Sequence, residues 1–235
     1  RLEPGQMPLQ TIVLLVIAAF AAGFVDAIAG GGGIITVPAL LSTGMDPRLV
    51  LATNKGQAVF GSTAGFIAFA RHGHIDRSRA GYSFVSALIG SALGAKLVLL
   101  INPTLLRPLV LVLLVVAALV SFAKRPQHSE PLGLVKNHPI FAALIVGLLL
   151  GAYDGFFGPG TGTFLLLIYA YLFGDELVRA SGNAKVANMA FNLAAFIVFA
   201  YSGSIQWSIA LPMGIAQMLG AQLGAGLAIK RGAGL

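Results

Sequence analysis

Two short stretches of the sequence place an aspartate beside a run of glycines inside otherwise apolar segments. Residues 23–33 contain Asp26 and end in four consecutive glycines. Residues 151–162 contain Asp154 and four further glycines after it. Glycine disfavours a continuous helix, and a carboxylate is costly at membrane depth. Paired breaks in the two halves of a chain indicate a transport site built from discontinuous helices.

A helix that begins at such a break is suited to binding an anion. Its N-terminus presents free backbone N–H groups and about half a positive charge, and glycine lets a ligand approach the backbone closely. We therefore predict an anion site between the two breaks. The residues expected to line it from the breaks are Gly30, Gly31, Gly32, Gly33, Thr36, Gly158, Gly160, Thr161, Gly162 and Thr163. The alternative is that the glycines only permit tight helix packing, which we prefer for Gly90, Gly94, Gly220 and Gly224.

Two lysines occur at matching points of the two halves, each near the expected start of a helix. Lys55 follows Thr53-Asn54, and Lys185 follows Asn183-Ala184. A lysine can attract an oxyanion, although a lysine that reaches out to lipid headgroups is an alternative. The amides expected to face the solute are Asn54, Gln57, Asn183, Asn188 and Asn192. They could equally bridge helices, and Asn183 could be an N-cap.

The two carboxylates look out of place in an anion site, and three roles are open for them. Asp26 and Asp154 could cap free N–H groups at the breaks, pair with the lysines, or bind a coupling proton or cation. We favour capping and pairing. His72 and His74 have no carboxylate or further histidine at ligand spacing, so neither a metal site nor a cofactor is expected.

The composition indicates the elements that must position these residues. Of 235 residues, 57% are hydrophobic and 10% charged, against roughly 25% charged in soluble domains, and the mean hydropathy is +0.88. Because about 20 apolar residues make one span, we predict an all-α, polytopic transmembrane bundle. The expected helices are 11–28, 34–43, 51–70, 80–101, 104–123, 139–156, 161–173, 180–202 and 207–230. Segments 34–43 and 161–173 are too short to cross and follow the breaks directly.

The two halves of the chain repeat each other. A shift of 128 residues places Asp26 on Asp154, and after two extra residues a shift of 130 places Lys55 on Lys185. We predict a first transmembrane repeat at 11–101, a connecting helix at 104–123, a polar connector at 124–138 and a second repeat at 139–230. If each short segment turns back toward the side from which the preceding helix entered the membrane, five passes separate equivalent positions of the two halves. The repeats are then inverted, which we favour over parallel repeats.

The distribution of basic residues predicts the orientation. With alternating sides, one side collects most of the basic residues, namely Arg71, Arg77, Arg79, Lys124, Arg125, Lys136, Arg179, Lys230 and Arg231. The other side holds Arg1, Arg48 and Arg107. The positive-inside bias makes the first side cytoplasmic, so we expect a multi-pass plasma-membrane (inner-membrane) protein with its N-terminus outside and its C-terminus inside. This bias also accounts for the net charge of +7 without a nucleic-acid partner.

At this point the residues resemble a known family. Residues 23–38, followed by Ala52-Thr53-Asn54-Lys55, resemble the TauE/SafE family of sulfite exporters. Residues 158–162 and 184–188 are similar to that family's second repeat, and the likeness runs from about residue 10 to 230. The resemblance implies a membrane transporter for sulfite, sulfonates or related sulfur oxyanions, and not an enzyme.

We therefore expect an exporter of a small sulfur oxyanion with a central site at the paired breaks. The alternatives are a channel or facilitator for another small carboxylate or inorganic anion and, far less favoured, an intramembrane aspartyl protease using Asp26 and Asp154. The expected partners are the small anion and the lipid bilayer, and a homodimer is compatible with the sequence. The absence of cysteine excludes disulfides and thiolate chemistry.

Overall fold

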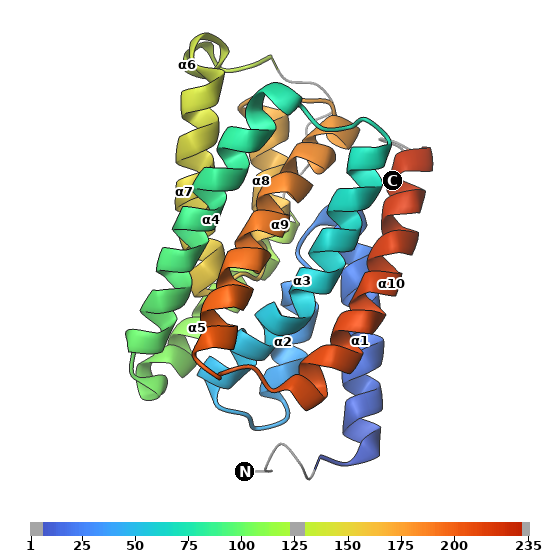
Figure 1. Ribbon diagram of the computed structural model, residues 1–235, viewed down its shortest axis with the longest axis vertical. Helices are drawn as coiled ribbons and strands as arrows, with labels where there is room; N and C mark the ends of the chain where they lie inside the picture. Colours follow the sequence, from blue (N-terminus) through green and yellow to red (C-terminus); the bar gives the residue numbers. More distant parts are fainter. Residues whose placement is uncertain (1–6, 123–129, 232–235) are drawn as a thin grey trace.

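The described part of the protein is entirely helical. The computed structural model describes residues 7–122 and 130–231, and within these ranges it contains ten helices and no strand (Figure 1). They are α1 (Leu9–Ala29), α2 (Gly33–Leu41), α3 (Pro47–Arg71), α4 (Arg77–Leu100), α5 (Pro103–Ser121), α6 (Gly133–Asn137), α7 (Pro139–Phe156), α8 (Thr161–Tyr171), α9 (Leu177–Tyr201) and α10 (Trp207–Arg231). The predicted all-α class is confirmed.

Several helices are long and apolar enough to cross a membrane. Among the described residues these are α1, α4, α5, α7 and α9. Their outer faces carry large apolar side chains that are well exposed, including Leu14, Ile89, Val116, Leu149 and Ile197. Such faces suit hydrocarbon and not water. The chain is a multi-pass membrane protein.

Two helical hairpins turn back inside the molecule at the glycine breaks. α2 has nine residues and α8 has eleven, so at 1.5 Å per residue neither spans a hydrocarbon core of about 30 Å. In Figure 1, α2 returns toward the end of the molecule where α1 begins, and α8 returns toward the end where α7 begins. Gly30, Gly31, Gly158 and Gly160 all have positive φ between 76° and 92°, a conformation that other residues rarely adopt. The two expected short segments are confirmed.

The last helix of each half packs against the first helix of the other half. α4 lies along α7, and α10 lies along α1. A Cβ added to Gly90 would lie 2.2 Å from the Leu148 carbonyl oxygen, and one added to Gly220 would lie 2.1 Å from the Phe20 carbonyl oxygen. Gly94 and Gly224 make equally close backbone contacts. The packing role expected for these four glycines is confirmed.

Corresponding helices run in opposite directions along the molecule. α1 and α3 ascend in Figure 1, whereas α7 and α9 descend. α1 begins at the lower end and α10 finishes at the upper end, where α3 also ends and α4 and α9 begin. An inverted repeat requires such an arrangement, and the repeat, its inversion and the domain boundaries stay predictions. Arg1 and residues 124–129 of the expected connector lie outside the described residues.

Two sequence-based expectations about helix starts are wrong, and a short helix lies in the region of the expected connector. α3 begins at Pro47, four residues before the expected start, because Asp46 caps it by accepting a hydrogen bond from the Arg48 N–H (2.9 Å). α9 begins at Leu177 with Glu176 at the N-cap position, so Asn183 lies inside the helix and is not an N-cap. The short helix α6 interrupts the region expected to be a polar connector.

Candidate functional site

The tips of the two hairpins meet at the centre of the molecule. A Cβ added to Gly30 would lie 2.3 Å from the carbonyl carbon of Gly162, and one added to Gly162 would lie 2.9 Å from the Gly30 Cα. The Thr163 hydroxyl donates to the Ala29 carbonyl oxygen across the same gap (3.4 Å). Side chains at the two glycines would push the tips apart. The glycines therefore bring two helix breaks into direct contact.

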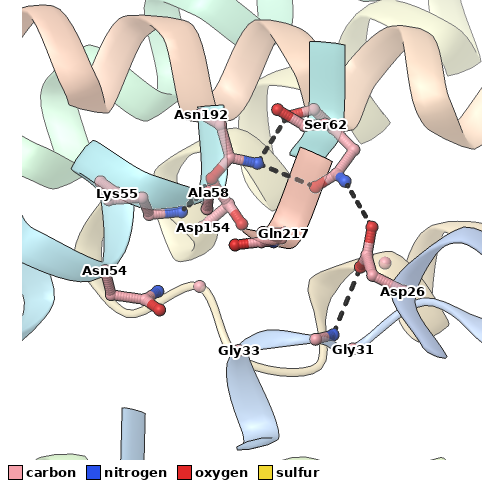
Figure 2. A pocket seen from close by; sticks show the side chains of 14 residues that line it. Asp26, Gly31, Gly33, Asn54, Lys55, Ala58, Ser62, Asp154, Asn192 and Gln217 are labelled. Atoms are coloured by element: carbon pink, nitrogen blue, oxygen red, sulfur yellow. Dashed lines mark hydrogen bonds and ion pairs between the residues drawn. The ribbon is translucent and has the colours of Figure 1, made fainter. Parts of the chain in front are cut away.

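A small polar cavity lies beside this contact (Figure 2). Its volume of about 30 Å³ is enough for a water molecule or two. The helix N-termini contribute to it through Gly32, which precedes α2, and through Gly33 and Gly162 in the first turns of α2 and α8. Its lining residues are Asp26, Gly31, Gly32, Gly33, Asn54, Lys55, Ala58, Ser62, Asp154, Gly158, Gly162, Asn188, Asn192 and Gln217.

The first lysine is paired with the aspartate of the opposite half. Lys55 Nζ lies 2.5 Å from Asp154 Oδ2, and the two side chains are only 3% and 2% exposed. Asn192 Oδ1 is a second, longer contact of the same ammonium at 3.5 Å. A buried charge is tolerated where it is paired and hydrogen-bonded. The pair therefore joins α3 to the end of α7 inside the bundle.

The second lysine makes the reciprocal pair. Lys185 Nζ lies 2.8 Å from Asp26 Oδ2 and donates to the Asp26 backbone oxygen at 2.5 Å. The other oxygen of this carboxylate accepts from the Gly32 N–H at 3.3 Å, and Asn188 Nδ2 donates to Oδ2 at 3.4 Å (Figure 2). Asp26 thus both pairs with a lysine and caps the N-terminus of α2, as we favoured.

A short hydrogen-bond chain fixes one of the lining amides. Asn54 Oδ1 accepts from the Thr36 hydroxyl at 2.6 Å and from Gln57 Nε2 at 3.0 Å. Thr36 belongs to α2 and the two amides to α3, so this chain holds the half-helix against its neighbour. Thr36 and Gln57 are not among the lining residues of the cavity and act through Asn54 instead.

The other expected site residues lie around the cavity or away from it. Gly30 and Lys185 line a second, smaller cavity of about 10 Å³ next to the first. Thr161 bonds the Gly158 carbonyl oxygen (2.6 Å), and Gly160 abuts Ala117 of α5. These contacts shape the second break.

Asn183 belongs to a separate ionic cluster at the end of the molecule where α4 and α9 begin. Its Oδ1 accepts from the Asp76 N–H (2.8 Å), and its Nδ2 donates to Asp175 Oδ2 (2.7 Å). The buried Arg79 guanidinium bonds both Asp76 and Asp175. Burial acts to raise the pKa of Asp76, but hydrogen bonds from Ser78 and the charge of Arg79 outweigh it, and the pKa lies below its ordinary value.

Three lining residues were not expected from the sequence. They are Ala58, Ser62 and Gln217, whereas Asn192 was expected as an inward-facing amide. The shift of 130 residues places Ser62 on Asn192 and Ala58 on Asn188, so the repeat itself carried a signal for these two. Gln217 corresponds to Ala87, and its only signal was a polar residue within a largely apolar segment.

Re-entrant half-helices that meet at a polar site are typical of membrane transporters. A family model described as sulfite exporter TauE/SafE matches residues 15–234, and the chain belongs to this family. It is therefore a membrane transporter and not an enzyme.

Relatives in several bacteria are similar over nearly the whole chain. The chain is 38% identical to the probable membrane transporter protein ORF9 of Sinorhizobium sp., over 94% of this chain and 85% of that protein. It is 37% identical to a probable membrane transporter protein of Haemophilus influenzae (94% and 86%). It is 36% identical to the probable membrane transporter protein YfcA of Escherichia coli K12 (93% and 81%). No solved structure matches the chain.

Proposed function

We propose that the protein exports a small sulfur oxyanion, sulfite or an organosulfonate, through the cavity between the hairpin tips. The observation that carries the proposal is the convergence of two helix N-termini and Lys55 on one buried cavity, with Lys185 beside it. Backbone N–H groups at helix N-termini and ammonium groups are donors that bind oxyanions. The sulfur chemistry is taken from the family's description, because the relatives' names give no substrate.

In this mechanism the anion exchanges places with carboxylates. Both lysines are paired with aspartates, so an arriving oxyanion takes over donors that a carboxylate otherwise holds. A volume of about 30 Å³ leaves no room for sulfite or a sulfonate group, so binding also requires the hairpin tips to move. Because the anion replaces a carboxylate on the lysine, binding of the anion is coupled to movement of the hairpin tips.

Outward transport needs no coupling ion in this proposal. An inside-negative potential favours exit of an anion by about 2.3 kcal/mol per charge per 100 mV. A channel for another small anion is the second candidate, and a cavity of only about 30 Å³ favours a carrier over an open channel. Counterflow distinguishes the two in proteoliposomes, because a carrier loaded with unlabelled anion accelerates uptake of labelled anion and a channel does not.

The first test is ligand-induced thermal stabilisation of the purified protein by sulfite, thiosulfate, sulfate, sulfoacetate and acetate. A ligand at 100 times its Kd stabilises by about 2.7 kcal/mol. We expect a shift with at least one sulfur anion. Acetate alone shifting the melting temperature would move the assignment to carboxylates, and no shift with any anion would contradict the proposal.

The matched variants replace one buried pair and one exposed lysine. In Lys55→Met/Asp154→Asn the ammonium is lost without leaving a carboxylate unpaired, and the anion-induced shift should disappear. Lys96→Met removes an exposed lysine of α4 and should leave the shift unchanged. An unchanged shift in the double variant would remove Lys55 from the binding site.

A further inference from the structure

Gln217 of α10 places a buried amide at the central cavity. It is 5% exposed and lines the cavity, and its Oε1 has no hydrogen-bond partner among the described residues. Figure 2 shows its amide reaching into the space between Lys55 and Asp26. A buried polar group that makes no hydrogen bond opposes folding. This side chain therefore calls for a partner that enters the cavity.

The helix crossing does not require a glutamine at this position. The shift of 130 residues places Gln217 on Ala87. A Cβ on Gly23 would lie 2.2 Å from the Gln217 carbonyl oxygen, and a Cβ on Gly151 would lie 2.7 Å from the Ala87 carbonyl oxygen. The two crossings have the same backbone contact, and in one of them alanine is sufficient.

The space is filled differently at the two crossings. Gly61 lies against the Gln217 side chain, since a Cβ there would be 2.6 Å from Gln217 Cγ. The counterpart of Gly61 is Phe191, which is fully buried beside Ala87's crossing with Gly151. In one half the ring of Phe191 fills the space beside Ala87. In the other half Gly61 leaves that space to the longer, polar side chain of Gln217. The space is filled at both crossings, so packing alone does not explain why residue 217 carries an amide.

The charges around the cavity set the charge of the ligand that fits. Lys55, Lys185, Asp26 and Asp154 form two ion pairs whose formal charges cancel. The N-termini of α2 and α8 remain, each worth about half a positive charge. Their sum is about one positive charge, which matches a monoanion better than a dianion.

We propose that Gln217 is a specificity-determining residue that hydrogen-bonds the transported anion and selects a singly charged oxyanion that still carries a proton. This inference rests on the proposed function. The amide has one donor end and one acceptor end, so it pairs with an oxyanion oxygen and a neighbouring hydroxyl, as in hydrogen sulfite. Sulfate is a dianion without a proton at neutral pH. It therefore exceeds the single positive charge of the two helix N-termini and offers no hydroxyl to the Gln217 amide oxygen. A site built to hydrogen-bond a hydroxyl discriminates strongly against analogues that lack it.

The test measures the melting temperature and anion affinity of the same purified variants. Gln217→Met keeps the length of the side chain and removes the amide. Without anion it should melt close to wild type, because the substitution keeps the side-chain length and water can enter the cavity beside the amide of the wild type. Its affinity for sulfite at pH 6, where the protonated monoanion prevails, should fall about tenfold or more. Gln222→Met, at an exposed position of the same helix, should change neither value.

A ligand series separates the selectivity from binding itself. Wild type should bind hydrogen sulfite more tightly than methanesulfonate and methanesulfonate more tightly than sulfate, and Gln217→Met should lose the preference for hydrogen sulfite. A variant with lower stability and unchanged affinity would make Gln217 a structural residue and overturn the inference alone. Equal wild-type affinity for sulfate and hydrogen sulfite would also overturn it. Wild type that binds none of these anions would overturn the proposed function and this inference together.

Discussion

At the scale of single residues, the charged groups of the cavity are organised as two reciprocal pairs. Lys55 of the first half contacts Asp154 of the second, and Lys185 of the second contacts Asp26 of the first. Burying an ammonium or a carboxylate alone would cost far more than an ordinary fold can offset. The pairs therefore allow charge at this depth, and they also join the two halves of the chain where the hairpin tips meet.

The first prediction concerns the energy of one pair. Lys55→Met leaves the Asp154 carboxylate buried without its cation and should destabilise the protein by about 3–5 kcal/mol. Lys55→Met/Asp154→Asn removes both charges and should recover most of that loss. Chemical unfolding in detergent, followed for the two single variants and the double variant, measures the coupling. Additive effects of the two single substitutions would mean that the pair does not exist in the membrane-embedded protein.

The sequence was informative about which residues bear charge and uninformative about their partners. The breaks, both lysines and all five glycines that line the cavity could be recognised because their residue types are unusual in an apolar chain. The partner of each lysine comes from the other half, and such contacts depend on tertiary packing that no local pattern encodes. Asn183 shows the converse: its type suited the site, yet its place in α9 turns it toward Asp76 and Asp175.

At the scale of elements, close helix crossings depend on glycines that are spaced four residues apart. Both short helices could be predicted because glycine and proline end a helix wherever they occur in runs. The start of α3 was missed although Asp46-Pro47 is a sound N-cap signal and apolar residues follow it from Leu49 on. A helix of five residues such as α6 is too short to leave a periodic pattern.

The second prediction tests one crossing with a matched pair of substitutions. Gly220→Ala places a methyl group 2.1 Å from the Phe20 carbonyl oxygen, so α1 and α10 must separate and stability should fall by about 1–3 kcal/mol. Gly226→Ala lies in the same helix with no atom within 4 Å of its Cβ. It should be neutral or stabilising by up to about 1 kcal/mol. Equal stability of both variants would contradict the α1–α10 contact.

At the scale of the whole molecule, the first helix of each half packs on the last helix of the other half, so neither half is complete alone. α1 packs on α10 and α7 packs on α4, and each hairpin tip rests against the other tip. Relative movement of the halves therefore shifts both tips and both ion pairs at once. In the proposed carrier mechanism, opening the site toward one side and closing it toward the other then become one movement.

The third prediction concerns the direction of the two halves in the membrane. The chain has no cysteine, so a single introduced thiol reports one position. His72 is the C-cap residue of α3 and Ser202 is that of α9; both are exposed, and the shift of 130 residues relates them. α3 and α9 end at opposite ends of the molecule (Figure 1), and the positive-inside bias assigns the end of α3, with Arg71 and Arg77, to the cytoplasm.

An impermeant maleimide applied to intact cells should therefore label Ser202→Cys and leave His72→Cys unlabelled until the membrane is permeabilised. Parallel repeats would place both thiols on one side, so equal labelling of the two variants in intact cells would refute inversion. The reverse pattern, with only His72→Cys labelled from outside, would keep the inversion and reverse the orientation. In that case the end of α3 lies outside and the end of α9 in the cytoplasm, while the membrane potential still favours outward movement of an anion.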